Sequence, residues 1–242
     1  RDSLSFKPES RAGIQLNYKP SADLSLVGQI VARATDTTPN IQWAYGGYKF
    51  NKNWELQVGR KRIPLYYYSD FQDVGLSYPW VAPPPELYGW EVTNFNGASL
   101  RYTNTYGETN VSASLFAGSE TVKDPRYLLL YYPDKSEVSW KSIVGGDMEI
   151  NHGALTVRGV YMTATAKSKV PSLDINDSAK LSAYGVAMNL DLDQWFVLSE
   201  LTQLERKFDA AGYSYKAPAM TFGVGVHLGE WTPFLNYAQY KE

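Results

Sequence analysis

The chain has no cysteine and only two histidines among its 242 residues. The lack of cysteine excludes a disulfide framework, cysteine-ligated zinc or iron–sulfur centres, and a thiol nucleophile. With only His152 and His227, a site that needs several histidine ligands is not expected. We therefore predict neither a metal site nor a cofactor.

Strong net charge and long apolar runs are also lacking. The formal net charge is −2, so no overall basic field would recruit nucleic acid. No apolar run approaches the roughly 20 residues of a membrane-spanning helix. The opening segment, RDSLSFKPES, does not read as a signal peptide. Hydropathy suggests a water-soluble protein, but a membrane β-barrel gives the same reading because only alternate residues face lipid.

What the chain does contain is a persistent alternation of apolar and polar residues. In MTFGVGVHL, residues 220–228, one face carries Met, Phe, Val, Val and Leu, and the other carries Thr, Gly, Gly and His. A period of two predicts β-strands. The runs that follow it are 12–19, 23–35, 40–50, 53–62, 96–104, 108–119, 136–150, 154–166, 179–191, 194–206, 218–229 and 231–241.

The lengths of these runs and of their connections indicate a barrel. Strands of soluble proteins usually have about five or six residues, whereas about ten suit a tilted strand that crosses a bilayer. Short connections alternate with longer ones. The short set is 19–23, 51–53, 104–108, 151–153, 191–194 and 229–230, and the other set is 36–39, 63–95, 120–135, 167–178 and 207–217. This predicts an all-β, antiparallel up-and-down barrel rather than a Greek-key sandwich.

Alternation alone does not say which face is inside. Trp54, Trp195 and Trp231 each follow a short turn almost directly, as an aromatic girdle at one membrane interface requires. The opposite face carries many charges, which suit a water-filled lumen but equally the outside of a soluble barrel. The tryptophans therefore favour a transmembrane barrel.

With six short turns, unequal loops and one long folded loop, the chain resembles a Gram-negative outer-membrane porin. The resemblance covers essentially the whole chain, 1–242, as a single domain, at the level of architecture and without a signature motif. It implies sixteen strands, so the twelve runs would be part of a larger barrel that is incomplete at both termini; a closed twelve-stranded barrel is the alternative. It also implies that the third external loop folds into the lumen. Counting 1–11 and 36–39 as the first two external loops makes 63–95 the third.

Segment 63–95 has the composition of such a constriction loop. Its many aromatic residues could form a small core, and its prolines restrict the backbone. The resemblance implies loop acids that face wall bases across the channel. The candidate acids are Asp70, Asp73 and Glu86, and the candidate bases are Arg33, Lys61, Arg101, Lys141 and Arg158. An extracellular lid or a trimer-packing loop are the alternatives.

The resemblance implies an outer-membrane pore for passive diffusion of small hydrophilic solutes or ions. It also implies contacts with outer-membrane lipid and lipopolysaccharide, and a homotrimer. Arg60 and Arg62 fall on the apolar phase of their strand, so we expect them to meet lipid headgroups or lipopolysaccharide phosphates. The alternative is a soluble or surface β-barrel that binds carbohydrate through its aromatic residues. A membrane-barrel enzyme is not expected, because no nucleophile, base and orienting group come together in the pattern.

Overall fold

The computed structural model describes residues 10–34, 36, 38–75, 77–125, 134–209 and 212–241. These residues form one antiparallel sheet of twelve strands, each paired with its neighbours in the chain. The strands are β1 Arg11–Tyr18, β2 Leu24–Arg33, β3 Asn40–Lys49, β4 Trp54–Arg62, β5 Asn94–Tyr106, β6 Thr109–Lys123, β7 Glu137–His152, β8 Leu155–Val170, β9 Ile175–Asp191, β10 Trp195–Phe208, β11 Tyr213–Val226 and β12 Phe234–Tyr240. The predicted all-β, up-and-down antiparallel fold is confirmed.

Helical structure in the described residues is confined to three short segments. They are η2 Ser69–Phe71, α1 Pro85–Tyr88 and η3 Pro171–Leu173. None of the described helices is long and apolar enough to cross a membrane.

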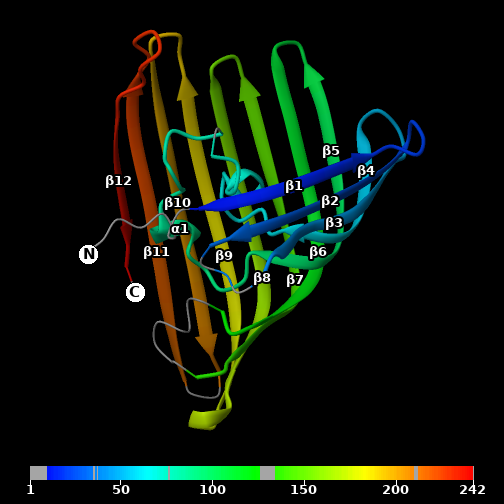
Figure 1. Cartoon of the computed structure of the whole chain (residues 1–242), viewed down its shortest axis with the longest axis vertical. Helices are drawn as coiled ribbons and strands as arrows, with labels where there is room; N and C mark the ends of the chain where they lie inside the picture. Colours follow the sequence, from blue (N-terminus) through cyan, green and yellow to red (C-terminus); the bar gives the residue numbers. More distant parts are fainter. Residues whose placement is uncertain are drawn as a thin grey trace.

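The sheet curls on itself. Figure 1 shows β1–β4 crossing in front of the longer strands β7–β11, with the loop between β4 and β5 and its helix α1 in the same region. Within the described part of the chain, β1 and β12 each have one strand partner, β2 and β11 respectively. The number of strands in a complete barrel stays a prediction, as does a single domain over 1–242.

The two ends of the strands differ, as predicted. At one end, short turns use glycines in the left-handed region, with φ of 61° at Gly107, 55° at Gly153 and 64° at Gly229. We call this the short-turn end. At the other, the loop end, the longest connection is 63–93, which we call the long loop.

Two predicted long loops are wrong. Segment 167–178 is mostly strand, because β8 continues to Val170 and β9 begins at Ile175, and segment 207–217 is likewise shortened to 209–212. The β8–β9 extension is mainly Lys, Ser, Asn and Asp, so no apolar alternation marks it in the sequence. The β10–β11 extension does carry large side chains, Phe208, Tyr213 and Tyr215. The predicted loops 1–11 and 120–135 lie partly outside the described residues, at 1–9 and 126–133.

The sheet has two unlike faces. On the outer face large apolar side chains are exposed, such as Leu115 at 68% and Leu201 at 58%. On the opposite, inner face of the same strands lie Arg158, Glu200 and Arg206, all of which touch the long loop. The core of the molecule lies between the long loop and this inner face. It includes Leu87 from the loop and Trp140, Met162, Ala183 and Leu204 from the sheet.

Candidate functional site: a long loop held against the inner face

The long loop is folded inward, as the resemblance implies. Its own core consists of aromatic rings: Tyr66 lies 4.8 Å from Tyr88, and Tyr68 lies 5.4 Å from Trp80, centroid to centroid. Such pairs add to the free energy gained from burying their area. The aromatic residues that stand out in the sequence are therefore the packing of the loop itself.

One side of the loop is fixed to β8. Arg158 donates from Nη1 to the carbonyl oxygens of Tyr66 and Tyr67, at 3.2 and 3.1 Å, and from Nη2 to that of Pro64 at 3.0 Å. A single guanidinium thus pairs with three loop carbonyls, of which that of Tyr66 also accepts from the Ser69 backbone N–H at 3.1 Å. Arg158 also lies 3.5 Å from Asp147 of β7.

A second tether is on β10. The buried carboxylate of Glu200 accepts a hydrogen bond from the Tyr67 backbone N–H at 2.9 Å and from the Tyr88 hydroxyl at 2.7 Å. Burial, together with the charge of Glu200, raises the pKa of Tyr88 well above its usual value, so the hydroxyl remains a donor. Farther along β10, Arg206 is ion-paired with Glu91 of the loop.

The opposite side of the loop is fixed to the N-terminal strands through Asp73. Its carboxylate accepts from Arg33 Nε at 2.9 Å and Nη2 at 2.6 Å, pairs with Arg62, and lies 3.7 Å from Arg11. Burial alone would raise the pKa of Asp73, but the charge of Arg62 and the hydrogen bonds from Arg33 lower it. The loop therefore connects β1, β2 and β4 with β8 and β10.

A third group of charges lies on the inner face of β4 and β5, apart from these tethers. Lys61 donates to Gln57 Oε1 and to Ser99 Oγ, and its Nζ lies 5.5 Å above the Tyr45 ring. Arg101 on β5 is the cross-strand partner of Glu55 on β4. Asp70 of the loop acts electrostatically on both Lys61 and Tyr45.

The predicted site residues therefore divide into three groups. Asp70 of the loop and Arg101 of β5 both act electrostatically on Lys61 of β4. Asp73, Arg33 and Arg158 instead hold the loop in place. Glu86 lies half-buried on α1, a short helix that packs near β11 and β12. A role of any of them in solute passage stays a prediction.

The prediction that Lys141 lines the lumen is wrong. Lys141 is exposed and directly follows Trp140, which is fully buried in the core. A register shift between Lys141 and Val144, where Ser142 has φ of 52°, changes the alternation along β7. Lys141 therefore faces outward.

The prediction that Arg62 faces outward, toward lipid headgroups, is also wrong. Its side chain is 1% exposed, pairs with Asp73 and donates to the Ser69 carbonyl oxygen at 3.2 Å. β4 ends at Arg62, so the strand period no longer fixes where this side chain points. Arg60 pairs with Glu120, and its contact with lipid stays a prediction.

Three tether residues were not among the predicted sites. Glu200 lies on the polar phase of β10, which is the signal that could have found it, and Arg11 and Arg206 lie near strand ends close to loops. The described residues contain no group of three or more His, Cys, Asp or Glu side chains that could hold a metal ion.

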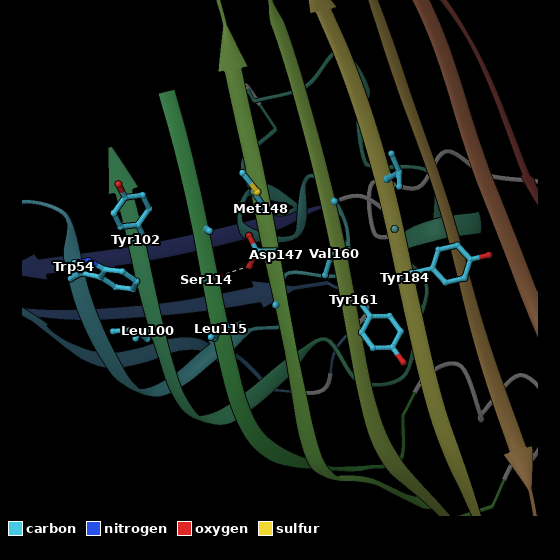
Figure 2. A pocket seen from close by; sticks show the side chains of 15 residues that line it. Trp54, Leu100, Tyr102, Ser114, Leu115, Asp147, Met148, Val160, Tyr161 and Tyr184 are labelled. Atoms are coloured by element: carbon cyan, nitrogen blue, oxygen red, sulfur yellow. Dashed lines mark hydrogen bonds between the residues drawn. The ribbon is translucent and has the colours of Figure 1, made fainter. Parts of the chain in front are cut away.

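The outer face has the opposite chemistry. Figure 2 shows an open depression of about 660 Å³ across β4–β9, with the side chains of Trp54, Leu115, Met148, Tyr161 and Tyr184 around it. Contiguous apolar surface of this extent is unusual on a protein surrounded by water and marks a protein or membrane contact.

No protein-family model matches the chain, and no curated protein sequence matches it. Among solved structures it is similar to OmpF of Salmonella typhi in complex with daunomycin (13% identity, TM-score 0.49, 94% of this chain and 81% of that one). It is also similar to OmpT of Vibrio cholerae in trimer form (16%, 0.45, 95% and 80%) and to an anion-selective porin from Comamonas acidovorans (13%, 0.42, 98% and 81%). All these TM-scores are below 0.5, so a functional conclusion depends on the residues of this chain.

Proposed function

We propose that this chain forms the wall of a water-filled channel in the bacterial outer membrane, through which small hydrophilic solutes or ions diffuse passively. The observation that carries this proposal is the inverted distribution of side chains. Apolar residues are exposed on the outer face, while the inner face carries charges and a tethered loop. A soluble barrel requires the reverse arrangement.

The dimensions support the same conclusion. On β8 the outward apolar residues extend from Leu155 to Tyr161. That is roughly 20 Å along the strand, from six rises of about 3.3 Å. At the strand tilt of about 40° in outer-membrane barrels it is roughly 15 Å in height, which fits within their apolar band of about 25 Å. Trp195 lies at the short-turn end of this band and Tyr184 at its loop end, as aromatic girdles would.

The long loop is the proposed constriction. It is held at opposite sides by Asp73 and Glu200, so it stays inside the curled sheet instead of covering its mouth. We propose that solutes pass between the loop and the sheet. Lys61, Arg101 and Glu55 line this route on the sheet side, and Asp70 lines it on the loop side. Opposed charges across a narrow passage order water and favour dipolar solutes.

The carbohydrate-binding alternative is disfavoured by the same loop. Tyr66, Tyr68 and Tyr78 are buried within it and offer no exposed aromatic platform. We propose a non-enzymatic pore without a cofactor, in contact with lipid and lipopolysaccharide. A homotrimer is the expected assembly, since closed cyclic assemblies are common.

The experiment is single-channel conductance in a planar bilayer, for the full chain and for a variant that lacks residues 66–90. Stepwise conductance that increases in the variant would support both the pore and its constriction. Conductance steps of unchanged size would support the pore but contradict the role of the long loop as its constriction. A protein that stays soluble without detergent and gives no steps would overturn the proposal.

A further inference from the structure

Three aromatic side chains stack on one another at the loop end of β10 and β11. Phe208, the last residue of β10, lies 4.8 Å from Tyr213, the first residue of β11, measured between ring centroids, and their planes differ by 14°. Phe208 also lies 6.2 Å from Tyr215, with 24° between the planes. Offset parallel stacking is one of the arrangements that aromatic rings favour. We call Phe208, Tyr213 and Tyr215 the aromatic stack.

The aromatic stack is on the same side of the sheet as the tethers of the long loop. Phe208 is two residues beyond Arg206 on β10, so both side chains point to the inner face. The strand register pairs Phe208 with Tyr213 and Arg206 with Tyr215, which places both tyrosines on that face as well. The guanidinium carbon of Arg206 in turn lies 5.5 Å from the ring centroid of Trp90 in the long loop. The stack therefore leads from the rim of the inner face to the long loop.

The stack lies beyond the apolar band of the outer face. Tyr184, at the loop end of that band, is opposite Gln203 of β10. Phe208 is farther along β10 by roughly 16 Å, at about 3.3 Å per residue. Neither contact with lipid nor the aromatic girdle therefore accounts for these rings. A solute that approaches the inner face from the loop end meets the stack before it meets the long loop.

The aromatic stack has an open face. Tyr213 is 53% exposed. Because Phe208 lies nearly parallel to Tyr213 and covers one face of its ring, the opposite face contributes to this exposed area. The rings of the long loop differ in this respect: Tyr66 and Tyr68 are 6% and 7% exposed, so the packing of the loop itself already covers them. An open ring face in water gains free energy when a second flat ring covers it.

The side chains around the stack favour an aromatic ring over a sugar. A sugar needs polar side chains for its hydroxyl groups as well as a ring face. The charged neighbours of the stack are already paired: Arg206 with Glu91, and Asp209 with Lys180 at 2.6 Å. An aromatic ring needs no such partner, because face-to-face stacking itself stabilises it.

We infer that the aromatic stack binds solutes that carry an aromatic ring, which stacks on the open face of Tyr213. The site lies at the loop-end mouth of the channel, so it concentrates such solutes there before they pass the long loop. The inference rests on the proposed function, because only in a channel is this rim on the route of a solute. It deepens that function by naming a class of solute.

The test titrates the full chain, folded in detergent, with benzoate and follows the benzoate ring protons by saturation-transfer NMR. Benzoate has an aromatic ring, and its charge keeps it in water instead of the micelle. Cyclohexanecarboxylate has the same charge and a similar size but no aromatic face. It should bind about fivefold more weakly, which is the fold-change that corresponds to the additional stabilisation of a stacked aromatic pair.

Two substitutions of Tyr213 separate the effect of the ring from that of apolar bulk. Tyr213→Leu keeps an apolar side chain but loses the ring, so it should bind benzoate about fivefold more weakly. Tyr213→Phe keeps the ring and should bind like the wild type. The matched control is Tyr106→Leu, which removes a tyrosine of similar exposure, 58%, from the short-turn end. It should also bind like the wild type.

Equal benzoate affinity of Tyr213→Leu and Tyr106→Leu would overturn the inference, and so would equal affinity of the wild type for the two carboxylates. Tighter binding of maltose than of benzoate, lost in Tyr213→Leu, would also overturn it, since the stack would then be a sugar site. Conductance separates this result from the proposed function. A wild type that conducts but binds no benzoate would refute the aromatic site and leave the pore. A wild type that binds benzoate through Tyr213 but forms no channel would refute the pore and leave the aromatic site.

Discussion

Asp73 gives the sharpest prediction about how the loop is held. The Asp73→Asn substitution keeps the shape of the side chain but removes the carboxylate that Arg33 and Arg62 share, with Arg11 3.7 Å away. Arg33 keeps its ion pair with Asp36. The Asp73 and Arg62 side chains are 6% and 1% exposed, so Arg62 would be left as a buried charge without its counterion. Breaking such a pair costs about 3–5 kcal/mol.

We expect the lower end of that range, about 3 kcal/mol, because Arg33 and Arg11 are partly exposed and water can reach them. At about 1.4 kcal/mol per factor of ten, the ratio of docked to released loop would fall more than 100-fold. The Arg158 and Glu200 tethers would remain. The segment around Asp73 should therefore loosen, while residues 64–67 and Tyr88 stay held and the loop does not detach.

Single-channel recording is the assay. Asp73→Asn should give larger and noisier conductance steps than the wild type, because the constriction is released intermittently. Asp70→Asn is the matched control: the same loop loses the same charge, but Asp70 acts on Lys61, and its electrostatic effect on Arg62 is smaller than that of Asp73. It should change ion preference and leave the noise unchanged. If Asp73→Asn conducts quietly at wild-type amplitude, the Asp73 cluster does not hold the loop.

Three further predictions concern the second tether, pH and the outer face. Glu200→Gln leaves one of the two donors, the Tyr67 N–H or the Tyr88 hydroxyl, without its acceptor, which should destabilise the docked loop by about 1–3 kcal/mol. Limited proteolysis should therefore cut the long loop of this variant faster than that of the control Glu205→Gln, whose side chain faces outward. The pKa of Asp73 is lowered, so its tether is fully present above the unfolded value of about 3.9 and is lost as pH falls through the lower folded value. The excess conductance noise of Asp73→Asn over the wild type should therefore persist from pH 8 to 5 and disappear only in stronger acid, and its disappearance near pH 6 would contradict this. Leu115→Lys should make the free energy of folding into lipid vesicles less favourable by about 2–4 kcal/mol. Ser112→Lys, on the inner face of the same strand, should fold normally. The mobility shift between heated and unheated samples on a gel measures the folded fraction of both.

Much of the sheet could be predicted because one physical constraint acts on every strand. One face that exposes apolar side chains and one that carries polar ones impose an alternation that runs through residues such as Phe222, Val224 and Val226. The long loop could be predicted too, since its aromatic residues have no place in that alternation. These features are local, so the sequence alone reveals them.

The failures occur where that constraint stops. On the outer face of β8 beyond Tyr161, Thr163, Thr165 and Lys167 continue the strand without an apolar signal. At Lys141 one irregular step reverses the faces, and no residue type marks it. Arg62 points inward because its partner Asp73 comes from the loop, a contact that depends on tertiary structure.

The central claim is that the inner face borders water and the outer face borders lipid. Because the chain has no cysteine, single cysteines can be introduced and labelled without background. Arg101 and Leu115 suit this test: they lie next to each other in the β5–β6 register, face opposite sides and are both exposed. In protein reconstituted into vesicles, a membrane-impermeant thiol reagent should label Arg101→Cys and leave Leu115→Cys unlabelled. Rapid labelling of Leu115→Cys with protection of Arg101→Cys would contradict the account.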